Sequence, residues 1–350
     1  MGSGLTRPLA VVTDDRHHLH DPPFELNGGS RVSPPPERPS RLAALREGLA
    51  DIDHVLVDVE AHGDGPLLAV HDAGLVDFLD HGYERWREAG GPDPLIPDTF
   101  VSSRWASMDP RPPTSPLAVP GWWCFDTASP LTRGSGTAAR AAADVALTAA
   151  GLLREDTSVA YALTRPPGHH TGVRTYGGFC LLNPAAVAAR ALSTAGRVAI
   201  VDIDVHHGNG TQEIFWTDPE VLYASLHGDP SSLFPFATGH AREIGGGAGL
   251  GATINVPLPP GTGDGSYLAE LDEILAVVDR YAPTAVVVSL GFDAAAGDPL
   301  GPLALTPAGF AEVGRRIGAL QRPTLLVQEG GYAEADLGPL LAATLGGLLT

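Results

Sequence analysis

The segment RVAIVDIDVHHGNGTQEIF, residues 197–215, joins an apolar run to a dense group of polar side chains. Residues 198–201 are apolar and mostly β-branched, which is typical of a strand buried on both faces of a parallel sheet. Asp202, Asp204 and His206 follow directly. Because successive strand side chains point to opposite faces, these three share one side. We therefore predict that two carboxylates and an imidazole converge at the end of a buried strand.

Carboxylate and neutral imidazole groups are ligands that zinc accepts, and a catalytic zinc has three protein ligands and one open position. Asp204 and His206 supply two ligands, and Asp293, just after a predicted strand at 285–290, is expected to supply the third. Because an Asp/His/Asp site is rich in oxygen, Fe2+, Co2+ or Mn2+ could replace Zn2+. The alternative is a helix-capping aspartate beside an incidental surface histidine.

The charge and cysteine content exclude several classes of protein. The 350 residues include 41 acidic and 22 basic side chains, a formal net charge of −19, which disfavours nucleic acid as a partner and suits a cationic substrate. Two cysteines are too few for a disulfide framework. No apolar run reaches membrane-spanning length, and the amino-terminal residues do not resemble a signal peptide. We expect a cytoplasmic protein with no membrane partner.

Predicted strands alternate with predicted helices along the chain, which indicates a parallel sheet covered on both faces. We expect a single α/β domain, 1–350. Residues 90–133 have no clean periodicity and many prolines, so they shape an active-site entrance or a subunit interface, or form a surface insertion. The predicted strands are 9–13, 54–59, 158–164, 198–201, 221–226, 252–256, 285–290 and 324–327. The predicted helices are 39–48, 73–89, 137–153, 184–193, 210–216, 266–281, 307–320 and 335–349.

Four predicted strands end in polar motifs, RPPGHH, DIDVHHG, GFDAAAGD and QEGGY, and parallel sheets bind ligands beyond the carboxyl ends of their strands. His169 and His170 could act as base and acid, because imidazole titrates near neutral pH. Tyr332 could donate its O–H to a developing oxyanion. Phe179 and Phe234 could line a channel. Taken singly, the histidine pair could be incidental, the tyrosine could pack on a turn, and the phenylalanines could belong to the core.

The motifs RPPGHH, GGFCLLN, DIDVHHGNGTQ, YASLHGDP, SLGFDAAAGDP and EGGY occur in this order, and together they resemble the zinc-dependent histone deacetylase superfamily. AVHDAGLVDFL and the long loop that ends in GWWC resemble its bacterial branch, the acetylpolyamine amidohydrolases. The resemblance covers about residues 9–349. It implies the arginase/deacetylase fold, with an eight-stranded parallel sheet, and the hydrolysis of an N-acyl amide to acetate and an amine.

The resemblance also implies roles for individual residues. His169 would be the general base, oriented by Asp202, and Tyr332 would polarise the carbonyl. His170 would be the partner acid or an electrostatic residue, oriented by Asn209, which is neutral where many family members have aspartate. The implied zinc ligands are Asp204, His206 and Asp293. The implied potassium ligands are Asp202, Asp204, His206, Ser225 and Leu226. The implied substrate tunnel contains Gly178, Phe179, Phe234 and Leu300.

The substrate is less sharply indicated. Leu300 follows GFDAAAGDP, as in lysine-directed relatives, and PLAVPGWW lacks the acidic residue that the polyamine branch carries there. We expect a small acetylated amine first, an acetyl-lysine peptide second and a specialised metabolite third. The long loop of that branch narrows the entrance and supports a homodimer, which we also expect.

Two other classes of protein fit the sequence less well. The related ureohydrolases use two manganese ions and need more bridging aspartates than this chain offers. A pseudoenzyme that binds acyl-amines without turnover is disfavoured, because every expected catalytic residue, including Tyr332, is present.

Overall fold

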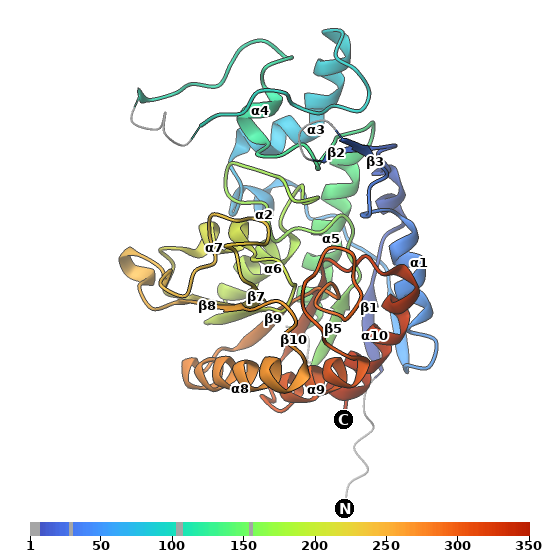
Figure 1. Cartoon of the computed structure of the whole chain (residues 1–350), viewed down its shortest axis with the longest axis vertical. Helices are drawn as coiled ribbons and strands as arrows, with labels where there is room; N and C mark the ends of the chain where they lie inside the picture. Colours follow the sequence, from blue (N-terminus) through green and yellow to red (C-terminus); the bar gives the residue numbers. More distant parts are fainter. Residues whose placement is uncertain (1–7, 28–30, 103–107, 154–156) are drawn as a thin grey trace, which may run out of the picture.

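A computed structural model describes residues 8–27, 31–102, 108–153 and 157–350. One sheet of eight parallel strands runs through the molecule in the order β4-β1-β5-β10-β9-β6-β7-β8 (Figure 1), which confirms the predicted α/β fold and its eight strands. The strands are β1 (Leu9–Val12), β4 (His54–Val57), β5 (Val159–Ala162), β6 (Val198–Asp202), β7 (Val221–Gly228), β8 (Thr253–Leu258), β9 (Ala285–Leu290) and β10 (Thr324–Gln328).

Helices cover both faces of this sheet. In Figure 1, α8 and α9 lie below strands β8–β10, while α5 and α6 lie above them. The helices are α1 (Ser40–Glu47), α2 (Asp64–Leu68), α3 (Ala73–Glu88), α4 (Pro120–Trp123), α5 (Ser135–Leu153), α6 (Pro184–Ser193), α7 (Asn209–Phe215), α8 (Asp264–Tyr281), α9 (Pro307–Gly318) and α10 (Glu334–Leu348). In the described part of the chain, no helix is both long enough and apolar enough to cross a membrane.

The alternation of side chains along each strand divides the apolar core in two. On β6, Val198 and Ile200 pack with α3, α5 and α6, whereas Ala199 and Val201 pack with α1, α8, α9 and α10. All four side chains are fully buried. Because both faces of the strand are covered, its sequence is continuously apolar until it reaches the edge of the sheet at Asp202.

Several short elements were not predicted. Residues outside the predicted helices and strands form a 3-10 helix, Asp15–Leu19, and an antiparallel pair of strands, β2 (Glu25–Asn27) and β3 (Arg31–Ser33). The segment 90–133, predicted to lack regular structure, contains the short helix α4. These elements are too short to show a period, and tertiary contacts define them. The Thr127 hydroxyl donates to Leu26 O at 2.7 Å, for example, and so joins β2 to the end of this segment.

Candidate functional site

The three predicted metal ligands converge at the carboxyl edge of the sheet. Asp204 and His206 follow β6, and Asp293 follows β9, the neighbouring strand. His206 Nδ1 lies 3.2 Å from Asp204 Oδ1 and 3.2 Å from Asp293 Oδ2. The ligand atoms of the three residues all lie within 4.8 Å of one another, and all three residues are buried. This is the spacing at which one ion could contact all three.

Main-chain N–H groups hold the two carboxylates in place. Val205 N donates to Asp293 Oδ1 at 2.9 Å, and Gly330 N donates to Asp204 Oδ2 at 2.8 Å. Burial and the charge of Asp204 raise the pKa of Asp293 to about 7. Burial opposes ionisation of Asp204, but nearby imidazoles hold its pKa below the usual range. Asp293 Oδ2 and Asp204 Oδ1 both face His206 Nδ1, and Asp204 Oδ1 also accepts a hydrogen bond from His206 N at 2.9 Å.

This donor set fits a divalent cation. The buried carboxylates of Asp204 and Asp293 lie close together and repel each other, and a positive charge between them relieves this repulsion. Asp and His side chains are also ligands that zinc accepts, and main-chain N–H groups hydrogen-bond the outer oxygens of both carboxylates. The chemistry of the ligands suits zinc, iron, cobalt and manganese alike.

His169 lies behind the metal ligands. Its Nδ1 is 3.1 Å from Asp202 Oδ2, which also accepts a hydrogen bond from the Tyr223 hydroxyl at 3.0 Å. Its Nε2 lies 3.6 Å from Asp204 Oδ1. Burial alone would lower the pKa of His169, but the charges of Asp204 and Asp202 outweigh it and raise the pKa well above its ordinary value. The ring is fixed in orientation and electrostatically favoured as a cation.

His170 has the opposite character. Its Nδ1 lies 2.7 Å from Asn209 Oδ1, as the prediction that Asn209 orients it requires. Because an amide oxygen only accepts, Nδ1 carries the proton in a neutral ring and Nε2 is free to accept one. Burial and repulsion from His169 and His206 lower the pKa of His170 well below its ordinary value. The two rings lie 4.1 Å apart, centroid to centroid.

Tyr332 is held by groups that sequence analysis did not identify. The Arg41 guanidinium lies 4.9 Å from the centre of its ring. Asp298 Oδ2 accepts a hydrogen bond from Tyr332 N at 2.7 Å, and Asp298 Oδ1 accepts one from Leu300 N at 2.9 Å. Burial raises the pKa of the phenol well above its ordinary value. Tyr332 therefore stays a neutral O–H donor at physiological pH.

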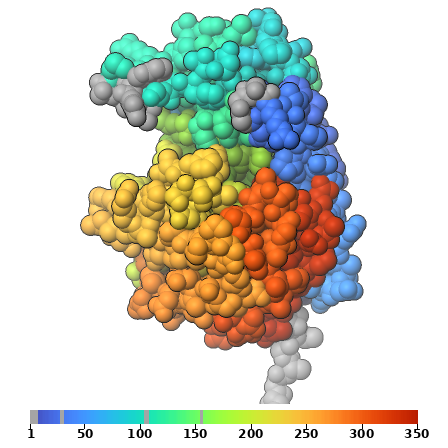
Figure 2. Space-filling view, viewed as in Figure 1, coloured from blue at the N-terminus to red at the C-terminus, as the bar shows by residue number. Residues whose placement is uncertain are grey.

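A cavity of about 280 Å³ reaches this group from the surface. Its lining includes His170, His206 and Tyr332, whereas His169 lies outside the lining. The four predicted tunnel residues, Gly178, Phe179, Phe234 and Leu300, all line it. Figure 2 shows the surface hollowed between the cyan-to-teal segment 90–133 and the yellow segment near residue 235, and both segments contribute to the lining.

Two aromatic rings narrow the cavity. The Phe234 ring meets the His170 ring edge-on at 4.9 Å, and the Phe179 ring lies 5.6 Å from the Tyr332 ring. Phe179 has φ +66°, a backbone conformation that non-glycine residues seldom adopt. Such a conformation persists where surrounding contacts impose it, and Ser129 Oγ accepts a hydrogen bond from Phe179 N at 2.9 Å.

Two acidic residues near the cavity were not predicted. Asp126 lines it, is half-buried, and accepts a hydrogen bond from Gly178 N. Glu25, only 2% exposed, receives a hydrogen bond from Asn27 Nδ2 at 2.6 Å on Oε1, while its buried Oε2 has no partner. Burial raises the pKa of Glu25 to about 7, and the charge of Asp126 adds to the effect. Neither residue follows a strand of the main sheet, so no motif marked them.

The predicted potassium ligands also come together. Asp202 on β6 is the register partner of Ser225 on β7, and Leu226 follows Ser225. Ser225 is fully buried, with its hydroxyl 2.8 Å from His227 Nδ1.

Comparison with known proteins shows similarity over nearly the whole chain. The family described as "Histone deacetylase domain" matches residues 35–348. Acetylpolyamine amidohydrolase 1 of Pseudomonas aeruginosa is 41% identical, with 94% of this chain and 95% of the relative covered. Acetylpolyamine amidohydrolase of Mycoplana ramosa is 38% identical, with 97% and 99% covered. The crystal structure of acetylpolyamine aminohydrolase from Burkholderia pseudomallei gives a TM-score of 0.92 at 36% identity, covering 97% of this chain and 98% of that one.

One buried histidine behind the site makes stability depend on pH. His71 Nδ1 lies 2.9 Å from Gly172 O, and His71 Nε2 accepts from Asn183 N at 3.1 Å, so the ring is neutral and bridges the loop after His170 to α6. Burial lowers its pKa to about 4. Since an unfolded histidine has a pKa near 6.5, the unfolded state binds the extra proton between these values.

We therefore predict that His71 costs stability as pH falls from about 6.5 to 4, by up to about 1.4 kcal/mol per pH unit. Urea unfolding at several pH values should show a shallower pH dependence for His71→Gln than for the wild type. His81→Gln, which removes an exposed imidazole on α3, is the control and should match the wild type. Parallel curves for His71→Gln and the wild type would contradict the prediction.

Proposed function

The chain belongs to the histone deacetylase family, and we propose that it hydrolyses the acetyl amide of N-acetylated polyamines, releasing acetate and the free amine. The observation that carries the proposal is that a single cavity is lined by the metal-ligand residue His206, the neutral His170 and the phenol Tyr332, with the carboxylate of Asp126 in the same lining. Relatives with this printed activity match over 94% and 97% of the chain. The net charge of −19 also favours a cationic substrate.

The catalytic metal would be held by Asp204, His206 and Asp293. When bound there, a zinc ion supplies a Lewis acid that lowers the pKa of water and polarises an amide carbonyl. Tyr332 donates its O–H to the carbonyl oxygen as negative charge develops.

We assign the proton transfers to His170. It lines the cavity and is neutral, so its Nε2 can take a proton from the attacking water and pass it to the leaving amine nitrogen. His169 lies behind the lining and, paired with Asp202, contributes positive charge. This assignment exchanges the roles that the family resemblance implied for the two histidines.

The cationic part of the substrate would be recognised by Asp126 and Glu25. The two carboxyl groups are close enough for the charge of Asp126 to raise the pKa of Glu25, and a substrate ammonium near them would relieve that repulsion. The unpartnered Oε2 of Glu25 is an acceptor available for such a cation. Phe179 and Phe234 would hold the alkyl chain between the cationic end and the amide.

The proposal extends to a structural potassium ion held around Asp202, Ser225 and Leu226, and to a cytoplasmic homodimer. Support for the potassium site is the pairing of Asp202 with the buried Ser225 on adjacent strands. Support for a dimer formed through segment 90–133 is that Val101, Met108 and Leu117 expose apolar side chains there.

The direct test of the function compares kcat/KM of the zinc-loaded enzyme on N8-acetylspermidine, acetylputrescine, acetylcadaverine and an acetyl-lysine peptide. We expect the small acetylated amines to be preferred by at least about tenfold, because the carboxyl groups of Asp126 and Glu25 near the cavity favour a substrate with a free ammonium group. A preference for the peptide would replace the polyamine assignment with an acetyl-lysine one. Inactivity on all four with metal bound would contradict both.

We predict that Tyr332→Phe lowers kcat by about 10²- to 10³-fold, because the oxyanion loses the phenol O–H donor in the cavity lining. Tyr332 is not among the metal ligands, so the metal content measured by mass spectrometry should equal that of the wild type. Parallel losses of metal and activity would show instead that the ring is needed for the structure of the site.

We predict that Glu25→Gln raises KM for N8-acetylspermidine roughly fivefold, the effect expected for losing one partly screened charge pair. KM for a neutral N-alkylacetamide of matched length should not change. Because the raised pKa of about 7 leaves Glu25 ionised only at higher pH, the wild type should favour the cation more strongly at pH 8 than at pH 6. Equal effects on both substrates would contradict this role.

A further inference from the structure

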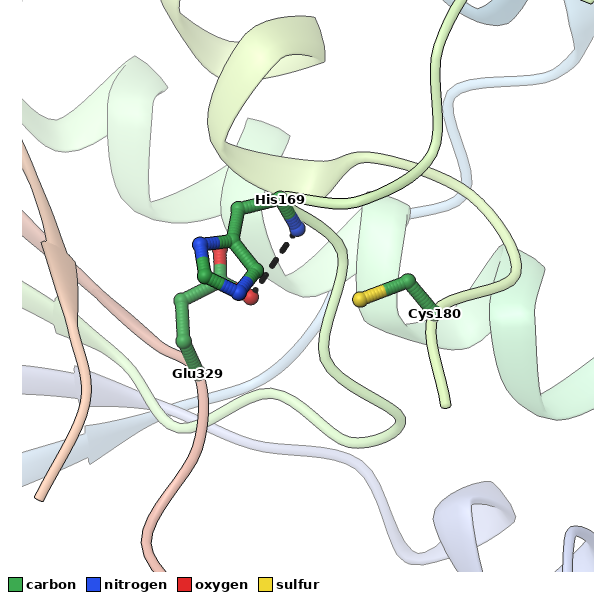
Figure 3. A group of neighbouring side chains, drawn as sticks. All are labelled: His169, Cys180 and Glu329. Atoms are coloured by element: carbon green, nitrogen blue, oxygen red, sulfur yellow. Dashed lines mark hydrogen bonds between the residues drawn. The ribbon is translucent and has the colours of Figure 1, made fainter. Parts of the chain in front are cut away.

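Glu329, which follows β10, lies beneath the loop that carries the two catalytic histidines. Its Oε2 accepts a hydrogen bond from Gly168 N at 2.6 Å. It accepts a second one from His169 N at 3.2 Å (Figure 3). The side chain is buried, with the residue 1% exposed, and it forms a compact group with His169 and Cys180. The mechanism proposed above gives Glu329 no part.

The backbone of Glu329 is fixed from two other directions. Its N–H donates to Leu290 O in β9 at 2.8 Å, and its carbonyl accepts from Arg41 Nη2 at 2.7 Å. Arg41 Nε also donates to Gly331 O at 2.6 Å, and the Arg41 guanidinium packs on Tyr332. The carboxyl group of Glu329 is therefore presented from a rigid base, three residues from the phenol.

The loop above it is also held by α7, because His169 O accepts hydrogen bonds from Gly210 N and Thr211 N, both at 3.1 Å, but the N–H groups of Gly168 and His169 find their partner in Glu329. Pro166 and Pro167 have no N–H to donate, and residues 163–170 belong to no helix or strand. The successive N–H groups of Gly168 and His169 both point at one oxygen of Glu329, an arrangement in which two main-chain donors bind a single acceptor. Because buried N–H groups need partners, removing that oxygen would leave the N–H groups of Gly168 and His169 unpaired and loosen this part of the loop.

We propose that Glu329 is a positioning residue that fixes the histidine loop relative to Tyr332, and thereby sets the distance between the proton-transfer group and the carbonyl-binding phenol. Because this role presupposes the proposed amide hydrolysis, its test includes a readout that does not depend on activity. An error of about 1 Å in such a distance can lower a rate by about 10²-fold.

The acceptor oxygen matters more than the negative charge. Glu329 Oε1 is buried and has no partner, so of the two carboxyl oxygens only Oε2 accepts hydrogen bonds from the loop. Burial raises the pKa of Glu329 to about 7, so the neutral acid is readily populated. A neutral acid and a glutamine amide both keep one oxygen that can accept from the loop.

The alternative function for the group is metal binding, because the ligand atoms of His169, Cys180 and Glu329 lie within 4.8 Å of one another. A metal would need the thiolate form of Cys180, but burial raises the pKa of this thiol well above its ordinary value. The sulfur also lies 3.5 Å from His170 N, which it accepts as a weak hydrogen bond. These contacts favour the positioning role.

The test compares Glu329→Ala with Glu329→Gln, and uses Cys180→Ala as the matched control in the same group. For Glu329→Ala, we expect kcat to fall about 10- to 100-fold with KM within about twofold of the wild type. For Glu329→Gln and Cys180→Ala, we expect kcat within about fivefold. Hydrogen exchange of the peptide spanning residues 164–172 should accelerate in Glu329→Ala alone, with one metal per chain in all four proteins.

Wild-type kcat and exchange in Glu329→Ala would overturn the proposal. So would a Glu329→Gln variant as impaired as Glu329→Ala, because it would show that charge rather than the acceptor matters. Two metals per wild-type chain, with one lost in both Glu329→Gln and Cys180→Ala, would assign the group to metal binding. If the exchange pattern holds while the wild type leaves acetylpolyamines intact, the positioning role stands and the proposed substrate falls.

Discussion

Three aspartate carboxylates lie buried together at one edge of the sheet, and the rest of the site is arranged around the cost of keeping them there. Asp202, Asp204 and Asp293 are each 0% exposed, so water cannot stabilise their charge. Burying a charge is strongly unfavourable unless it is paired and hydrogen-bonded. Main-chain N–H groups of residues 204, 205, 206 and 330 and the hydroxyl of Tyr223 supply the hydrogen bonds. Imidazoles and a cation must supply the charge.

The order of strands determines which groups lie close enough to stabilise these buried carboxylates. β6 lies beside β9, β9 beside β10, and β10 beside β5, so the chain leaving each strand emerges next to its neighbours. Asp204 on the β6 loop thus meets Asp293 on the β9 loop and Gly330 N on the β10 loop. The loop after β5 carries both histidines and lies over Glu329 at the end of β10. A parallel sheet with this strand order therefore brings the two histidines, the aspartates and the Tyr332 phenol to one edge, each on a short loop that follows its strand.

The fold and most of the site could be predicted because they depend on local patterns. A strand buried on both faces must be apolar throughout, and polar residues follow directly where it ends. Asp204, Asp293 and Tyr332 can therefore be identified from their positions just after predicted strands. Arg41 and Asp126 could not be found this way. Arg41 binds Gly331, 290 residues away, and Asp126 binds Gly178, 52 residues away. No period or spacing encodes contacts of that separation.

Burial of isolated polar residues was likewise beyond sequence reasoning. His17 and His20 lie in and beside a 3-10 helix and are 2% and 3% exposed. Their surroundings include Arg165, whose Nη1 donates to His17 O at 2.7 Å, and Glu37, which pairs with Arg165 at 2.8 Å. The sequence around these histidines is polar, so only the packing of distant segments reveals that water is excluded.

The same reasoning resolves the apparent conflict between Leu300 and a polyamine substrate. Leu300 lines the cavity and carries no charge, but the electrostatic field in a cavity depends on where charges lie in space, not on which loop carries them. Asp126 lines that same cavity, with Glu25 close behind. Their unfavourable burial, which raises the pKa values of both residues, is the kind of cost that a bound ammonium group would relieve. An apolar Leu300 is therefore compatible with a cationic substrate, because the acidic residues near the cavity lie on other segments.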